Sequence, residues 1–304
     1  MKTSNWKVWL LCAALLQALA AAPCAAHSGS VSWKKWTFDW RVANSAGIAL
    51  RSLRYNGILV MHEGSLPVIR VKYDGCTPPC GPYRDMITWD KLVEISNCGG
   101  VKVCTREFSA LGKQWLEIGV YARIGKYHLY QGWYLSEDGV INPFLFSKGL
   151  HHDFNHIHHA YWRFDFDLNG LASDRIFESN DGQAMTEYTV ERNALKETAT
   201  NRAWYVVDND KTFGNAVWIS PRMPNDGASN SFSTKDAAGR LYHDSEHEPW
   251  PFPVFDHLGY DNSESIQKTD VVFWYVSHLF HDHADSGSQW HVTGPILSLW
   301  NYPP

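Results

Sequence analysis

Apolar and polar residues alternate in short stretches along the chain, and these stretches are rich in aromatic and β-branched side chains. Successive side chains of a strand face opposite sides of a sheet, so such alternation is typical of half-buried strands. Helical periodicity is scarce. We therefore predict strands at residues 36–42, 67–73, 114–124, 160–168, 202–208, 215–220 and 270–279.

Turn sequences separate these stretches. They are Asn-Gly or Asp-Gly pairs at residues 56–57, 74–75, 138–139, 169–170 and 226–227. Tight turns between short strands favour hairpins, and a regular succession of them favours an all-β fold, an antiparallel β-sandwich. The sequence has neither an internal repeat nor a low-complexity linker. We therefore expect residues 27–304 to form a single domain.

The first 26 residues have the pattern of a secretory signal peptide. Lys2 and Lys7 precede a short apolar run, which ends in small residues with a cleavage point after Ala26. An uncleaved membrane anchor is the alternative, but the apolar run is short for a membrane span. We expect a secreted or periplasmic protein with no membrane partner.

Four cysteines follow the signal peptide, in two close pairs: Cys76 with Cys80, and Cys98 with Cys104. In an oxidising compartment this spacing favours two small disulfide loops, Cys76–Cys80 and Cys98–Cys104. Four cysteines allow three pairings, and a zinc site is the alternative. The zinc site is disfavoured because neither spacing is Cys-x-x-Cys.

Charge and aromatic content narrow the class of partner. The chain carries 27 basic and 32 acidic residues, a net charge of −5, and no basic run. This balance argues against nucleic acid as a partner. The aromatic residues make up 14% of the chain and permit a secreted carbohydrate-binding module as one function, although aromatics in all-β chains mostly pack in the core.

Histidines provide the strongest local signal, with five of them between residues 151 and 159. On a strand His156 and His158 point the same way and can bind one metal ion, with Ile157 turned into the core. A third imidazole can come from the segment DVVFWYVSHLFHDHAD, which offers His278, His281 and His283. Three imidazoles with an open position suit copper or zinc, and the residue types alone do not choose between them. The flanking His151, His152 and His159 are interpreted as surface residues.

The segment from His156 to Gly170, HIHHAYWRFDFDLNG, resembles the copper amine oxidase family. That family carries His-x-His, four further residues and then Arg-x-Asp-x-Asp, and here Arg163 keeps this register without a gap. The family's third copper histidine follows a strand that VVFWYVSHLFH resembles. The resemblance implies copper bound by His156, His158 and His281, with His283 as the runner-up for the third ligand.

The resemblance extends to the family's redox cofactor, a tyrosine of the chain that copper and dioxygen convert to topaquinone. The segment GKYHLYQGWYLSEDGVIN resembles the cofactor region and places Tyr127 at that position. Three neighbours depart from the family pattern: Arg123 replaces Thr, Lys126 replaces Asn, and His128 replaces Asp or Glu. A cation at Lys126 beside the ring is expected to alter or quench the cofactor chemistry.

Further catalytic residues follow from the same resemblance. The stretch MHEGSLPVIRVKYDG places Tyr73 where the family has a tyrosine that hydrogen-bonds the quinone. Asp85 stands at the position of the catalytic base, and Asp90 is the alternative.

The family also has a structural calcium-type site, which here would be Asp165, Asp167 and Asp270. Several carboxylates suit a hard cation. The alternative is that these acids pair with surface lysines.

The resemblance covers patches from Asn56 to Leu299, in a chain shorter than full family members. It implies oxidation of a primary amine by dioxygen to an aldehyde, ammonia and hydrogen peroxide, and it implies a homodimer. The altered neighbours of Tyr127 motivate an alternative: a copper-binding protein or copper oxidase on the same scaffold without topaquinone. A zinc hydrolase is disfavoured because the sequence HDSEH at residues 243–247 has Asp where the metalloprotease motif needs Glu.

Overall fold

The computed structural model describes residues 27–43, 45–77, 80–170, 174–208, 215–222, 226, 235–244 and 262–302. The signal peptide expected at residues 1–26 lies outside the described residues, and so does the HDSEH segment beyond Asp244.

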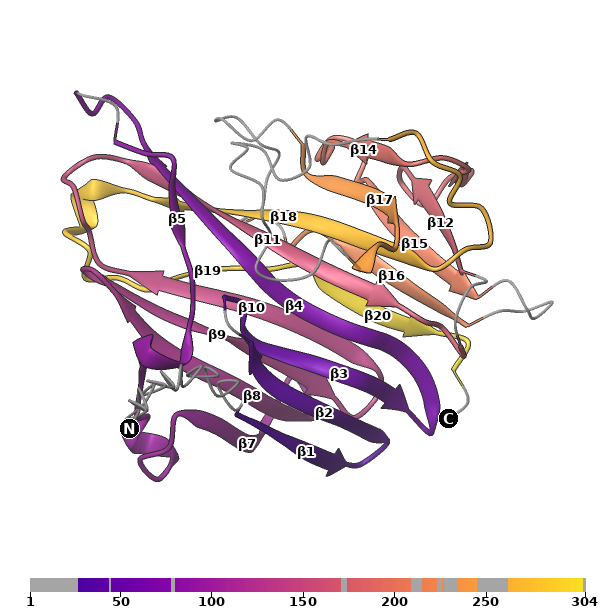
Figure 1. The fold of residues 1–304 in the computed structure, drawn as a ribbon, viewed down its shortest axis with the longest axis horizontal. Helices are drawn as coiled ribbons and strands as arrows, with labels where there is room; N and C mark the ends of the chain where they lie inside the picture. The colour runs from indigo at the N-terminus through magenta and orange to yellow at the C-terminus, as the bar shows by residue number, and fades with distance from the viewer. Residues whose placement is uncertain are drawn as a thin grey trace, which may run out of the picture.

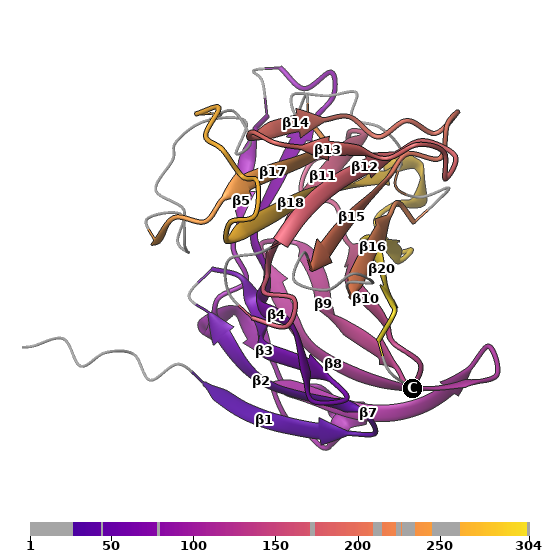
Figure 2. The ribbon, with the colours of Figure 1, turned by 90° about the vertical axis from the view of Figure 1, so that its right-hand side faces the viewer.

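Two antiparallel sheets face each other as the layers of a sandwich (Figures 1 and 2). The first sheet runs in the order β1 (Ser28–Trp33), β2 (Trp36–Ala43), β3 (Gly47–Tyr55), β4 (Ile58–Tyr73), β11 (His156–Phe166), β18 (Val271–His281), β17 (Ala237–Leu241) and β14 (Arg192–Ala194), and β5 (Tyr83–Asp85) pairs with β4. The predicted all-β antiparallel sandwich is confirmed.

The second sheet runs in the order β13 (Thr186–Tyr188), β12 (Asp174–Ser179), β15 (Ala203–Asp208), β16 (Ala216–Ser220), β20 (Ile296–Trp300), β10 (Val140–Lys148), β9 (Tyr127–Ser136), β8 (Lys113–Ile124) and β6 (Leu92–Val93). Two further strands extend it: β19 (His291–Thr293) pairs with β10, and β7 (Val103–Ala110) pairs with β8. Short 3-10 turns lie at η1 (Trp89–Lys91), η2 (Ser96–Cys98) and η4 (His283–Asp285).

The predicted strands are all present, as β2, β4, β8, β11, β15, β16 and β18. The turn at Asn56 and Gly57 shows why an Asn-Gly pair predicts a hairpin. Both residues have positive φ, 52° and 81°, which a two-residue type I′ hairpin turn requires and which Asn and Gly tolerate. Tyr55 and Ile58 therefore face each other across the β3–β4 hairpin.

Aromatic side chains from both sheets fill the core between them. Trp133 of β9 meets Trp162 of β11 edge to face, with ring centroids 5.7 Å apart. Its indole N–H donates to the carbonyl of Ile48, at 2.9 Å. Gly64 makes room for this ring, since a Cβ there would lie 2.8 Å from it. The core therefore fixes β9 against β4 and β11, the strands whose ends carry the predicted site.

Both predicted disulfides are present, Cys76–Cys80 and Cys98–Cys104, so the predicted pairing is confirmed. Disulfides persist in oxidising compartments, which agrees with an exported protein. The described residues contain no helix with the length and apolar character that a membrane span needs.

Candidate metal centre and active site

Strand register brings four residues of the predicted site together. On β11, His156 lies opposite His281 of β18 on one side and opposite Tyr73 of β4 on the other. Tyr127 begins β9 in the facing sheet. Side chains that are far apart in sequence thus converge at one edge of the sandwich.

The three predicted metal-binding histidines form a compact buried cluster. His156, His158 and His281 are fully buried, and their ligand nitrogens lie within 4.8 Å of one another. Nε2 of His156 is 3.2 Å from Nε2 of His158. Burial lowers the pKa of His156 to about 4 and the pKa of His158 well below its ordinary value, so both imidazoles are neutral. Neutral imidazoles present the lone pairs that a metal ion needs.

In His156 and His281, one ring nitrogen donates a hydrogen bond, which leaves the other ring nitrogen free to bind a metal. Nδ1 of His156 lies 3.1 Å from the carbonyl of Phe154, to which it donates, so Nε2 keeps its lone pair. Nε2 of His281 lies 3.1 Å from Oδ1 of Asp285, which leaves Nδ1 as the acceptor. That Nδ1 is buried with no hydrogen-bond partner among the described residues. Such contacts orient metal-binding histidines, and the unpaired nitrogen fits a metal ion.

Asp285 and His291 belong to the site but were not predicted from the sequence. The carboxylate of Asp285 accepts from His281 on one oxygen and from Nε2 of His291 on the other, at 2.5 Å. Asp285 lies on η4 and His291 on β19, and neither element has a periodic pattern that marks it. The only sequence signal is the four-residue spacing from His281 to Asp285.

Tyr127 lies between the histidine cluster and Tyr73. Its hydroxyl is 3.0 Å from Nε2 of His156 and shares a hydrogen bond with the hydroxyl of Tyr73. Burial, followed by the contact with Tyr73, raises the pKa of Tyr127 far above its ordinary value. The phenol is therefore neutral until a metal ion or another charge is present, and its oxygen points at the cluster.

Asp85 lies close enough to both tyrosines to raise the pKa of each electrostatically. Burial raises the pKa of Asp85 itself to about 7, and its Oδ2 is buried without a hydrogen-bond partner in the described structure. A carboxylate with a pKa near neutrality suits a general base. The alternative residue, Asp90, is exposed and bonds to Thr88.

The unusual neighbours of Tyr127 point away from its ring. Strand alternation turns Tyr127 inward, whereas Lys126 is exposed and His128 faces the outer surface, where it bonds to Tyr121. The side chain of Lys126 is exposed whereas the ring of Tyr127 is buried, which disfavours the expected cation beside the ring. Arg123, opposite His128 on β8, is also exposed.

Two expectations about the histidine segment need correction. Ile157 does not face the core: the core-facing positions of β11 are those of Ala160 and Trp162, which share the side of His156 and His158. His159 is not a surface residue. It is fully buried, with Nδ1 2.8 Å from Nδ1 of His278, because other parts of the chain cover the outer face of β11.

The remaining histidines lie outside the cluster. His151 is exposed, as expected. His152 is half-buried and packs edge-on against Tyr73, with ring centroids 4.8 Å apart. His283, the runner-up ligand, is exposed and bonds to Asn155 rather than joining the cluster.

The predicted calcium ligands also lie together. We call Asp165, Asp167 and Asp270 the carboxylate cluster, because one oxygen of each lies within 4.8 Å of the others. Burial raises the pKa of each to about 6. Oδ1 of Asp167 and Oδ1 of Asp270 are buried and unpaired among the described residues, so the cluster has free ligand atoms. Among the described residues, the cations in contact with the cluster are Arg163 and His62 rather than lysines, which disfavours the lysine alternative.

No protein-family model and no curated protein sequence matches the chain. Solved structures match its fold. The chain is similar to an amine oxidase of Aspergillus nidulans, with a TM-score of 0.72 and 15% identity over 99% of this chain and 56% of that one. It is also similar to a copper-containing benzylamine oxidase of Hansenula polymorpha, with a TM-score of 0.70 and 13% identity over 89% of this chain and 59% of that one. A lysyl oxidase of Pichia pastoris matches with a TM-score of 0.66 and 14% identity over 90% of this chain and 52% of that one.

These matches show that the chain has the fold of copper amine oxidases, with a buried histidine cluster consistent with a copper site. The chain spans 52% to 59% of the length of the oxidases it matches. At 13% to 15% identity the likeness concerns the fold, so the activity has to be argued from the residues of the site.

Proposed function

We propose that the protein is a copper-dependent amine oxidase. It oxidises a primary amine with dioxygen and water to an aldehyde, ammonia and hydrogen peroxide, and Tyr127 is the precursor of its topaquinone. One observation carries this proposal: the hydroxyl of Tyr127 lies 3.0 Å from Nε2 of His156, beside a buried three-histidine cluster, within a fold shared with copper amine oxidases.

Copper would be held by Nε2 of His156, by His158 and by Nδ1 of His281. Three neutral imidazoles suit copper, and the hydroxyl of Tyr127 lies next to one of them, His156. When bound, copper supplies the redox chemistry with dioxygen that oxidises the tyrosine ring. The protein supplies a buried, pre-oriented ring next to that ion.

Asp85 is proposed to take the α-proton of the amine. With a pKa of about 7 it is about half ionised at neutral pH and strong enough as a base to accept a proton. Tyr73 holds the oxygen of residue 127 through their hydrogen bond and so fixes the ring. The same burial that raises both tyrosine pKa values excludes bulk water from the reacting atoms.

The carboxylate cluster is proposed to bind a structural divalent cation of the calcium type. Its unpaired oxygens and mutual repulsion favour a hard cation. It joins the end of β11 to the start of β18, which are also the two strands that carry the histidines.

The test uses the mature chain from residue 27, loaded with copper under air and treated with phenylhydrazine. We expect a coloured adduct that peptide mapping assigns to Tyr127. Tyr127→Phe is the control: it should bind copper and form no adduct. Absence of the adduct in the wild-type protein, with copper bound, contradicts the quinone.

A second candidate function is a copper-binding protein or copper oxidase without topaquinone. It is favoured by the absence of the family's Asn and acidic residue on either side of Tyr127, where Lys126 and His128 stand instead. Copper bound in a one-to-one ratio beside an unmodified Tyr127 would support this candidate.

A further inference from the structure

The outer face of the second sheet carries a groove of about 710 Å³ that the proposed oxidase chemistry does not use. Five aromatic residues line it: Tyr121, Tyr130, Tyr134, Phe146 and Trp290. Strand alternation separates the groove from the metal centre, because Tyr127 faces inward whereas Tyr130 and Tyr134 of the same strand face outward.

Glycines let the aromatic rings lie flat on the sheet. A Cβ at Gly119 would lie 2.8 Å from the hydroxyl of Tyr130, and a Cβ at Gly132 would lie 2.8 Å from Cζ of Phe144. Tyr134 stacks on Phe144 with ring centroids 4.3 Å apart at 29°. The groove therefore has a broad apolar floor built from ring faces, the kind of surface on which another flat apolar face packs.

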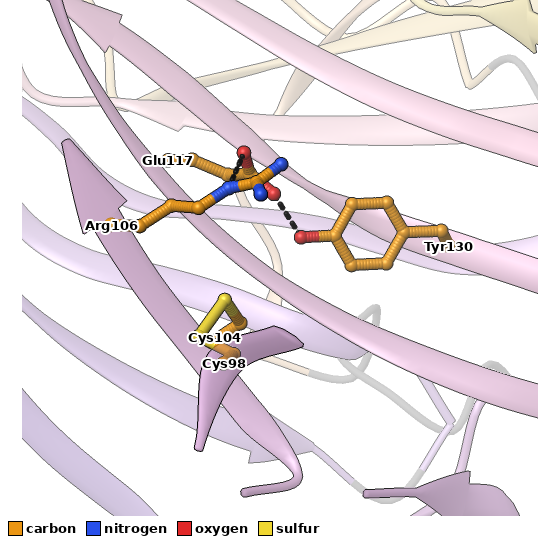
Figure 3. Close-up of a disulfide and its surroundings, with 5 residues drawn as sticks. All are labelled: Cys98, Cys104, Arg106, Glu117 and Tyr130. Atoms are coloured by element: carbon orange, nitrogen blue, oxygen red, sulfur yellow. Dashed lines mark hydrogen bonds and ion pairs between the residues drawn. A yellow bond between two sulfur atoms is a disulfide. The ribbon is translucent and has the colours of Figure 1, made fainter. Parts of the chain in front are cut away.

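Buried polar contacts hold one side of the groove in place (Figure 3). Glu117 is 1% exposed and accepts from Nε of Arg106 at 2.7 Å and from the hydroxyl of Tyr130. The disulfide Cys98–Cys104 ties the turn that lines the groove to β7. A ligand therefore meets a largely preformed site and loses little affinity to its ordering.

The groove and its rim carry one surplus positive charge, since three cations (Arg106, Arg123 and Lys148) stand against two carboxylates (Glu117 and Glu94). Arg106 balances the buried Glu117. Arg123 also lines the groove and is exposed, and no ion pair to it is present in the described part of the chain. Lys148 adds a second cation at the rim, with Nζ 4.8 Å from the centre of the Trp290 ring. This charge selects a ligand that bears carboxylates.

The groove also has hydrogen-bonding side chains at one end, and it extends across several strands. Glu94, Ser96 and Asn97 line one end and can bond to hydroxyl groups. The other lining residues lie mostly on β6 and β7, which both pair with β8, and on β8, β9 and β10, which are neighbours in that order. Three strand spacings amount to roughly 14 Å, which accommodates several linked rings rather than one.

We propose that this groove binds an acidic oligosaccharide, a short segment of a uronate-bearing glycan. The C–H faces of the sugar rings pack on the aromatic floor, a carboxylate meets Arg123, and hydroxyl groups bond to Glu94 and Asn97. Nucleic acid fits less well, because the chain carries a net charge of −5 and no basic run.

The test is calorimetric titration of the mature protein with oligogalacturonate, oligomannuronate and chondroitin oligosaccharides, with maltotriose as the neutral probe. We expect binding of at least one acidic probe and none of maltotriose. Arg123→Gln and Trp290→Ala should each weaken binding about tenfold or more. The matched controls Arg54→Gln and Trp218→Ala alter exposed residues outside the groove and should leave binding unchanged.

Three results would overturn the proposal: no binding of any acidic probe, equal binding of maltotriose, or binding that both groove variants leave intact. Sedimentation of the same samples tests whether a second copy of the chain, rather than a glycan, occupies the groove. A wild-type dimer that Trp290→Ala dissociates assigns the groove to self-association instead. The titration is performed with copper-free protein, so its outcome is independent of the proposed oxidase activity.

Discussion

Asp285→Asn tests whether the hydrogen bond from His281 to the Asp285 carboxylate keeps Nδ1 of His281 free to bind copper. The side chain of Asp285 accepts from Nε2 of His281 at 3.1 Å, from the backbone N–H of Gly287 at 2.6 Å and from Nε2 of His291 at 2.5 Å. An amide of the same size keeps one acceptor oxygen and places an NH₂ group against one imidazole. If that imidazole is His281, its proton moves to Nδ1, and the lone pair aimed at the metal is lost.

Loss of such an orienting contact typically costs 10- to 100-fold in metal affinity, or about 1.4 to 2.7 kcal/mol. We expect this loss for Asp285→Asn in competition titrations of copper against a chelator, together with a changed copper EPR spectrum. Asp153→Asn is the matched control, since Asp153 is an exposed carboxylate near the histidine segment. Wild-type copper affinity in Asp285→Asn, alongside strong loss in His281→Ala, would refute the reasoning.

Three other predictions concern pH, the second cation and a disulfide. The pKa of Asp85 is about 7 and only its ionised form accepts a proton, so kcat/KM should fall as pH drops below 7, and Asp85→Asn should abolish turnover. The carboxylate cluster holds protons to about pH 6 in the folded state and releases them near pH 4 when unfolded. Without a cation, stability should therefore fall from pH 4 to 6 and level off above; calcium at pH 7.5 should raise the Tm of the wild type but not of Asp270→Asn. Replacing Cys98 and Cys104 by Ser should lower the free energy of unfolding by roughly 2 kcal/mol in denaturant titrations, given the short loop that they close.

The sequence predicts well what local patterns control. Alternation predicts the strands and the shared direction of His156 and His158, and the Asn-Gly pair predicts the turn at residues 56–57, because each of these features depends on neighbouring residues. The position of His281 came from the family resemblance, since its pairing opposite His156 is a matter of strand register across distant parts of the chain. Periodicity carries no information about register between distant strands.

What covers each strand could not be predicted. Alternation assigns His159 to the outer face of β11 but does not reveal that His278 and other residues bury that face. Asp285 lies on a single 3-10 turn, which has no repeating pattern. The groove depends on Gly119 and Gly132 lying beneath rings of neighbouring strands, an arrangement visible only once β8, β9 and β10 are paired.

The most direct test of the central claim is the mass of the peptide that contains Tyr127, measured after copper loading without oxygen and again after exposure to air. The account predicts an unmodified tyrosine before air and, after it, a residue that has gained two oxygen atoms and lost two hydrogens, with His156→Ala unchanged throughout. An unmodified Tyr127 in copper-loaded, air-exposed wild-type protein would contradict the account.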